Sequence, residues 1–424
     1  MAIGGFYHCF TFLCIKTKMM GRISKLLLCI GLAAAGCTGI REMARPEKEE
    51  GEDIWTGPGA NIEAPEGSIC YITGIDYPEG YDWKSDDRAE SVRCSLVVFA
   101  DGVPMLKLPV GEGHEVSADA DRHRIVAGHL YTEYSTDGYT VLKKDGKPFL
   151  KYEGTESIRG MVIADGDVYT LGVPRDGQGF TYRKNGELLI ERRTGYAFER
   201  LNMDSGNICF AFCQPVTTAD GPAERYYIVR DGRISLVALS EETSKVWDIM
   251  SHQGEACALV SAGPWNTVEI IHGETEKAAG LPYGAEMLSC RLFQAGDDIC
   301  IEGMYSFNDE GHFSGIWVEG EQYMLFETGQ TISSSCASDT DICCVLNPTA
   351  DTMTGTIFKS GKTYPMPQGY SCTGNSPLAV HDGILYAGLT SRSTHRPLLW
   401  KNGKTDSLKL NGPLCSLVLS SASD

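Results

Sequence analysis

The sequence lacks the short motifs that usually mark a catalytic or metal-binding site. It has no Gly-x-Ser-x-Gly nucleophile elbow and no glycine-rich phosphate loop followed by lysine. Its nine histidines are scattered, without the His-x-His or His-Glu-x-x-His spacing that binds zinc. We therefore expect no metal and no cofactor, and the motifs favour no particular reaction.

Long apolar runs and positive charge are also scarce. After residue 40 no apolar run is long enough to cross a bilayer, while 42% of the 424 residues are apolar and can form a large core. The formal charge is −19, from 37 Lys and Arg against 56 Asp and Glu. Such an acidic surface disfavours nucleic acid and anionic membranes as partners, although it also serves solubility alone. We expect a soluble, monomeric body that binds no nucleic acid.

The first 36 residues have the opposite character. They contain four cations and no acid, then the apolar stretch 26–35, and then Gly36-Cys37. This arrangement resembles a bacterial lipoprotein signal, although Ala34 stands where that family usually has Leu. The resemblance implies that Cys37 is lipidated and becomes the mature N-terminus, with translation starting at Met19 or Met20. Ordinary cleavage without a lipid is the alternative.

The segment that follows is polar and rich in Gly and Pro, with little to bury. We expect a signal peptide over 1–36, a tether over 37–66 that spans roughly 30 Å, and one globular domain over 67–424. Lipidation at Cys37 would hold the domain in the bacterial envelope, on the outer membrane, facing the periplasm or the cell surface.

The globular part repeats one pattern of an apolar strand and a tight turn that ends in glycine. The turn glycines are 40 to 47 residues apart, at Gly102, Gly146, Gly186, Gly232, Gly273, Gly320, Gly361 and Gly403. Repeats of this period predict an all-β fold, a β-propeller. The weakest repeat is at Gly273. Omitting it would give seven blades but would leave a gap two blades long, so eight blades are preferred.

Each repeat is expected to form four antiparallel strands, with Asp-Gly or Asn-Gly at the tight turns because these residues tolerate positive φ. In one repeat the strands A, B, C and D are predicted at 161–164, 168–172, 180–184 and 187–191. The first B strand, 69–74, has no A strand before it. We expect residues 415–420 to pair with it, which would close the ring and cover its edge.

The repeat Trp400-Lys-Asn-Gly403, with the preceding Ile384-Leu-Tyr-Ala-Gly388, resembles the repeat-built propeller lipoproteins of Bacteroidota. The resemblance covers residues 68–420 at the level of the repeat pattern. It implies a propeller fold and an envelope location, and it carries over no catalytic residues.

Twelve of the 16 cysteines fall in the predicted propeller. Five occupy the same place in strand B, where small buried residues suit the packing between blades, so free buried thiols are expected: Cys70, Cys209, Cys257, Cys300 and Cys343. Disulfides remain the alternative in an oxidising periplasm. The best-placed pair is Cys336 with Cys343, on either side of a predicted turn.

Paired aspartates recur at the turns between strands A and B, as at Asp165 and Asp167. A calcium site is conceivable there. Two carboxylates fall short of the six to eight oxygens that calcium needs, and aspartate is a common turn residue. A structural role in the turns is therefore preferred.

Function is expected on the face that carries the B–C and D–A loops, because these loops vary in length on a rigid scaffold. The candidate ligand-binding residues are aromatic rings and His on or beside these loops, and three arginines near the start of strand A. Flat rings suit sugar faces or extended peptides, and guanidinium groups attract an anionic ligand such as a uronate. The candidates are Trp83, Trp265, His312, Tyr196, Tyr283, Tyr370, Arg159, Arg200 and Arg291.

Two functions remain open on this basis. The first is a lipid-tethered, non-catalytic binding or scaffold module for a glycan or an envelope protein. The second is a polysaccharide-active enzyme, a glycosidase or lyase, at the mouth of the central channel. Its acids would be Glu156, Glu199 and Glu286, which could instead neutralise the neighbouring arginines.

Overall fold

The computed structural model describes most of the chain after residue 67. The described ranges are 68–81, 94–110, 122–126, 128–136, 138–175, 177–198, 201–218, 221–239, 242–263, 267–273, 275–278, 285–307, 311–326, 329–338, 341–348, 354–372, 378–381, 383–394 and 396–421. No helix within these ranges has the length and apolarity to span a membrane. The predicted signal peptide, Cys37 and the tether lie outside the described residues.

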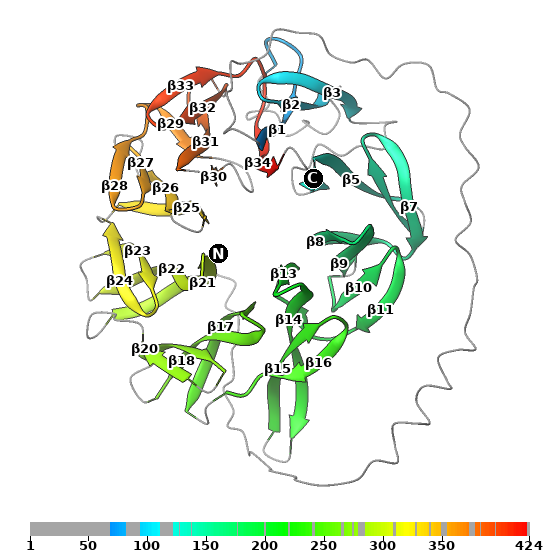
Figure 1. The fold of residues 1–424 in the computed structure, drawn as a ribbon, viewed down its shortest axis with the longest axis vertical. Coiled ribbons are helices and arrows are strands. Elements are labelled where there is room, and N and C mark those ends of the chain that lie inside the picture. Colours follow the sequence, from blue (N-terminus) through cyan, green and yellow to red (C-terminus); the bar gives the residue numbers. More distant parts are fainter. Residues whose placement is uncertain are drawn as a thin grey trace.

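The described strands form eight antiparallel sheets around a central axis, so the fold is an eight-bladed β-propeller and the prediction of eight rather than seven blades is confirmed (Figure 1). Blade 1 contains β34 (Leu414–Ser421), β1 (Ser68–Asp76), β2 (Cys94–Ala100) and β3 (Val103–Val110). Blade 2 contains β4 (His123–Val126), β5 (His129–Thr136), β6 (Tyr139–Lys144) and β7 (Lys147–Glu153). Blade 3 contains β8 (Glu156–Ala164), β9 (Asp167–Pro174), β10 (Phe180–Lys184) and β11 (Glu187–Arg192). Blade 4 contains β12 (Tyr196–Ala197), β13 (Asn202–Asp204), β14 (Asn207–Thr218), β15 (Gly221–Arg230) and β16 (Arg233–Leu236).

The second half of the ring repeats the pattern. Blade 5 contains β17 (Thr243–His252), β18 (Glu255–Ala262), β19 (Thr267–His272) and β20 (Thr275–Ala278). Blade 6 contains β21 (Ala285–Ala295), β22 (Asp298–Phe307), β23 (His312–Val318) and β24 (Glu321–Phe326). Blade 7 contains β25 (Gln330–Ala337), β26 (Ile342–Pro348), β27 (Thr356–Lys359) and β28 (Lys362–Pro365). Blade 8 contains β29 (Tyr370–Cys372), β30 (Leu378–His381), β31 (Ile384–Ser391), β32 (Pro397–Lys401) and β33 (Lys404–Ser407).

The C-terminal strand closes the ring. β34 pairs antiparallel with β1, and the register runs from Ser421 opposite Ser68 to Leu414 opposite Gly74. β34 thereby becomes the innermost strand of a blade whose other three strands come from the N-terminal end of the domain. The pairing predicted for residues 415–420 is confirmed, and the inner edge of β1 is covered.

The strand predictions for blade 3 were right in number and order but too short for the inner strand. β10 has the predicted bounds, whereas β8 begins at Glu156 rather than at residue 161. A register shift between Ile158 and Gly160 separates the first residues of β8 from the rest. The bulge interrupts the local pattern, and pairing with β9 keeps the early part of β8 extended.

The tight turns explain the glycine pattern. Ten described non-glycine residues have positive φ, and each precedes a glycine, as primed two-residue hairpins require: Asp101, Asp145, Asp165, Asn185, Ser205, Asp231, Gln253, Glu319, Ser360 and Asn402. His272, before Gly273, is not among them, which accounts for the weak repeat at that point.

Apolar clusters fill the spaces between neighbouring blades. The cluster between blades 3 and 4, for example, brings Tyr182 and Phe180 against Phe210 with ring centroids 4.9 and 5.8 Å apart. The five strand-B cysteines are fully buried in such layers, and all 12 described cysteines are free thiols. Cys336 lies directly opposite Cys343 in the hairpin of β25 and β26, as predicted, and both remain thiols.

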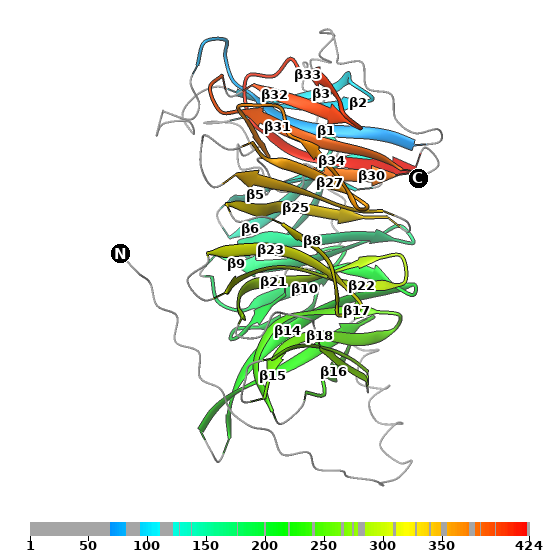
Figure 2. The same ribbon diagram turned by 90° about the vertical axis from the view of Figure 1, so that its left-hand side faces the viewer.

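The topology gives the propeller two unlike faces. Each inner strand A runs toward the short A–B turn, so the A–B and C–D turns share one face, here called the turn face. The B–C and D–A connections share the other, here called the loop face. The side view shows the long hairpin of β14 and β15 projecting at the loop face, and the end of β34 at the turn face (Figure 2).

Candidate functional site

A pocket opens on the wall of the central channel, where the inner strands of four consecutive blades meet. It holds about 200 Å³ and is lined from β13, β17, β21 and β25. The lining residues are Asn202, Met250, Ser251, Arg291, Leu292, Phe293, Gln294 and Ser335. The sequence alone does not reveal this pocket, because the strands that line it are about 40 residues apart in the chain.

Arg291 is the predicted candidate that lies in this pocket. Its Nη2 donates to Glu302 Oε2 at 2.8 Å and to Ser335 Oγ at 2.9 Å. Glu302 sits opposite Arg291 in the neighbouring strand of the same blade, whereas Ser335 belongs to the next blade. The guanidinium is thus held in place by two strands and is 45% exposed in its side chain.

The pocket lies on the turn-face side of the inner strands and not at the loop face where the arginines were expected. Arg291 is the seventh of the eleven residues of β21, only four residues before its end at Ala295. Ser251 and Ser335 likewise occur within two or three residues of the A–B turns of their blades. The expectation that Arg291 begins strand A was wrong because β21 starts at Ala285, well before the apolar stretch that signals it.

The ion pairs of Arg291 and Glu156 do not join neighbours in the sequence. Arg291 pairs with Glu302, and Glu286 is exposed on β21. Glu156 pairs with Arg183, and Arg159 is exposed on β8. Antiparallel pairing within a blade brings Arg291 close to Glu302, 11 positions away, and Glu156 close to Arg183, 27 positions away.

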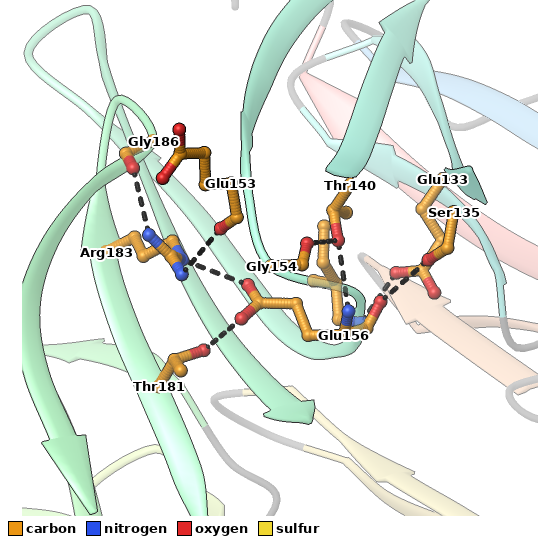
Figure 3. A network of polar contacts seen from close by, with 10 residues as sticks. Glu133, Ser135, Thr140, Glu153, Gly154, Glu156, Thr181, Arg183 and Gly186 are labelled. Carbon is orange, nitrogen blue, oxygen red and sulfur yellow. Dashed lines mark hydrogen bonds and ion pairs between the residues drawn. The ribbon is translucent and has the colours of Figure 1, made fainter. Parts of the chain in front are cut away.

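Glu156 is the centre of a buried polar network between blades 2 and 3 (Figure 3). Its Oε1 accepts from Arg183 Nε at 3.2 Å, and its Oε2 accepts from Thr181 Oγ1 at 2.5 Å. Arg183 also donates to the carbonyls of Glu153 and Gly186. With a side chain only 2% exposed, Glu156 is a structural anchor rather than an acid open to a substrate.

Tyr152 covers the Arg183 end of this network. The Arg183 guanidinium lies 4.4 Å from the centroid of the Tyr152 ring, a cation–π contact in a buried setting. Burial, followed by the charge of Glu156, raises the pKa of the Tyr152 hydroxyl far above its usual range. The phenol is therefore neutral at all physiological pH values.

A second buried acid, Glu133 on β5, lies beside this network. Its Oε2 accepts from the backbone N–H of Ile158 at 2.6 Å, while Arg124 donates to the carbonyl of the same residue at 2.7 Å. Blade 2 thus binds both backbone polar groups of Ile158 in blade 3. Within the described ranges Oε1 of Glu133 is buried with no hydrogen-bond partner. Burial raises the pKa of the carboxyl to about 7 against the lowering effect of the Ile158 N–H, Arg124 and Arg122.

Sequence reasoning missed Glu133, although a signal was present. Glu133 is a charged residue in the middle of a strand B whose equivalents in other blades are mostly apolar or small. An acid at such a position needs a buried donor. The donor is a backbone N–H of the next blade, which no local pattern reveals.

The other predicted residues are spread around the ring. Tyr196 begins β12 in blade 4, is 42% exposed and packs edge-on against Phe198. His312 is exposed at the start of β23 in blade 6, and Tyr370 is half-buried at the start of β29 in blade 8. All three lie at the loop face but on different blades. Trp83, Arg200, Trp265, Tyr283 and Glu199 lie outside the described residues.

A further groove of about 270 Å³ lies between blades 4 and 5 on the outer side of the ring. Its walls are mostly apolar, from β15, β16, β18 and β19, with Arg230 and Glu255 as its charged residues. In the described ranges no three His, Cys, Asp or Glu side chains come together as a metal site would require.

Comparison with known proteins gives no family. No family model matches the chain, and no curated protein is similar in sequence. The β-propeller domain of the Trilobed protease from Pyrococcus furiosus, which has an open velcro topology, is similar in structure. The TM-score is 0.42, with 11% identity over 72% of this chain and 97% of that one.

Two peptidases are similar at the same level. The acylaminoacyl peptidase of Pyrococcus horikoshii has a TM-score of 0.43 and 9% identity, covering 78% of this chain and 57% of that one. A post-proline cleaving enzyme from Rickettsia typhi has a TM-score of 0.38 and 9% identity, covering 70% of this chain and 53% of that one. This chain therefore spans little more than half the length of these two enzymes. Similarity at this level does not indicate a shared activity.

Proposed function

We propose that this protein is an envelope-anchored lipoprotein that acts as a non-catalytic binding or scaffold module. The propeller would be tethered through a lipid on Cys37 and would present its loop face to a glycan or to an envelope protein. The supporting observation is topological. All B–C and D–A connections converge on one face of a rigid ring, where His312 and Tyr196 are exposed.

The burial of Glu156 disfavours the alternative of a glycosidase or lyase. A hydrolytic pair needs two carboxyl groups that both reach the sugar. Glu156 is engaged with Arg183 and Thr181, and Glu133 beside it is 1% exposed, so neither described acid is open to a polymer in the channel. Glu286 is exposed, but it is not among the residues that line the channel pocket.

A glycan array followed by product analysis of every hit tests the binding role. We expect retention of a glycan without any shortened or unsaturated product. Copurification with an envelope protein in the absence of glycan binding would favour the scaffold form of the proposal. Turnover of a bound glycan would contradict it.

The anchor is tested separately by mass spectrometry of the membrane fraction. A diacylglyceryl mass on a peptide that begins at Cys37 is expected, and Cys37→Ser should release the protein from the membrane. An unmodified Cys37 in a soluble product would reject the lipoprotein part of the proposal and leave the binding role to be judged on its own assay.

A further inference from the structure

The channel pocket at the turn face combines one cation with a lining that carries no acid among the described residues. Arg291 is its only charged lining residue in that part of the chain. This contrasts with a chain whose formal charge is −19. The negative net charge of the protein repels anions in general, so a pocket lined by one cation and no acid is a place where an anion can bind.

The guanidinium of Arg291 is held through one of its three nitrogens and keeps donors on the other two. A guanidinium has five N–H groups, and both described contacts of Arg291 use Nη2, to Glu302 and Ser335. Nε and Nη1 make no hydrogen bond with any described residue, so their N–H groups remain available. Glu302 does not line the pocket, and its side chain is only 15% exposed. The pair with Glu302 thus orients the guanidinium without placing a carboxylate in the pocket.

Two further polar groups face the same space. The Ser335 hydroxyl accepts from Arg291, so its own hydrogen remains available to donate. The Asn202 amide lines the pocket and makes no hydrogen bond within the described residues. By contrast, Ser251 donates its hydroxyl hydrogen to Asp204 Oδ2 at 2.5 Å and is already committed.

The apolar wall and the volume of the pocket limit the polarity and the size of a ligand. Met250, Leu292 and Phe293 form an apolar side of the pocket. A volume of about 200 Å³ is below the roughly 300 to 1,000 Å³ typical of drug-sized ligands. The space therefore suits a single small unit with one charged end and one less polar face.

We propose that this pocket binds a small organic carboxylate, which accepts a hydrogen bond from a free N–H of Arg291 and lies within reach of the donors of Ser335 and Asn202. Hydrogen bonds from a guanidinium to a carboxylate are charge-assisted and stronger than those between neutral groups. The carboxylate can come from a sugar acid or from the end of a peptide. The site is distinct from the loop-face site proposed above, because its lining residues lie on the halves of the inner strands that lead to the A–B turns.

The test is a calorimetric or NMR titration of the full chain with paired ligands. Galacturonate and N-acetylalanine carry the carboxylate, and galactose and N-acetylalaninamide are their neutral counterparts. We expect at least one carboxylate to bind about tenfold or more tightly than its neutral counterpart, with weaker binding at high salt. The pair that shows this preference identifies the source.

Variants then place the ligand. Arg291→Gln removes the charge at similar size and should weaken carboxylate binding about tenfold or more, while Arg291→Lys keeps the charge with fewer donors and should retain part of the affinity. Arg233→Gln, on the exposed outer strand β16, is the control and should bind as the unaltered protein does.

Two results would overturn the inference. The first is that the unaltered protein binds both members of each ligand pair equally, or binds neither at millimolar concentration. This result does not depend on the folding of a variant. The other is an affinity of folded Arg291→Gln within about twofold of the unaltered protein. A glycan-array hit that persists in Arg291→Gln while carboxylate binding is lost would support two separate sites.

Discussion

The side-chain Oδ1 of Asn402 accepts a hydrogen bond from the backbone N–H of Leu385 at 3.0 Å, while the Asn402 N–H donates to the Leu385 carbonyl at 3.1 Å. A residue in the C–D turn thus satisfies both backbone groups of a residue at the start of strand B. Asp101, Asp145, Asn185, Asp231, Glu319 and Ser360 make the same side-chain contact in their own blades. These recurrent turn residues therefore have a structural role, as expected for residues that combine positive φ with an acceptor.

This contact predicts a measurable cost at Asn402. Asn402→Ala removes the acceptor and places alanine at positive φ, whereas Asp165→Ala has the same backbone cost at a turn residue with no hydrogen bond from its side chain in the described structure. We expect Asn402→Ala to lower the free energy of unfolding by about 1 kcal/mol more than Asp165→Ala does. Urea denaturation measures the difference, and equal losses would show that the contact adds nothing.

Breaking the buried ion pair should cost more than breaking an exposed one. Glu156→Gln leaves the guanidinium of Arg183 without a counter-charge in a buried site, which costs about 3 to 5 kcal/mol. Glu191→Gln breaks the exposed pair with Arg193 and should cost less than about 1 kcal/mol. Chemical denaturation of the two variants compares them. A Glu156→Gln protein as stable as the control would contradict the structural role of Glu156 and reopen a catalytic one.

Glu133 should make stability depend on pH. Its pKa rises from 4.5 to about 7 in the folded chain, so the folded state holds this proton more tightly than the unfolded state. The stabilising contribution is complete below about pH 4.5 and is lost as pH rises to about 7, up to about 3 kcal/mol. Glu133→Gln cannot titrate, so its stability relative to the unaltered protein should rise across that range.

Unfolding free energies measured from pH 4.5 to 8 test this difference. Glu321→Gln, which removes an exposed carboxyl on the outer strand β24, is the matched control and should follow the unaltered protein at every pH. Parallel curves for Glu133→Gln and the unaltered protein would show that Glu133 does not titrate in this range.

The closing strand should be indispensable to the fold. A chain that stops at residue 413 loses β34, with the buried Leu414 and Leu417, and the contact between the hydroxyls of Thr73 and Ser416 at 2.7 Å. The exposed edge of β1 should cause aggregation and loss of a cooperative unfolding transition. A chain that stops at Ser421 keeps β34 and should unfold as the full chain does. Light scattering and thermal denaturation distinguish the two truncations.

Much of the fold could be predicted because its signals are local. The spacing of turn glycines indicated eight blades, and the absence of an inner strand before Ile69 indicated where residues 415–420 belong. Strand B cysteines were expected to be buried, and Cys70 and Cys343 are completely buried. Each of these features depends on one turn or one strand, so a linear pattern contains it.

The site was much less predictable. Arg291 was chosen for its charge, but its partner Glu302, its contact with Ser335 and its place at the turn face came only with the structure. Glu133 was missed because its donor belongs to the next blade. Contacts between blades join residues that do not recur at a fixed spacing in the sequence. The type of a polar residue does not indicate which residue of the next blade it will contact.

The amino-acid sequence by itself determined the repeat, the number of blades and the strand that closes the ring, because turn chemistry and strand alternation act over a few residues. Only the tertiary structure decided which carboxylates are buried, which arginine keeps free donors and where a pocket forms. Those properties depend on the approach of inner strands from different blades, which exists only once the ring is closed.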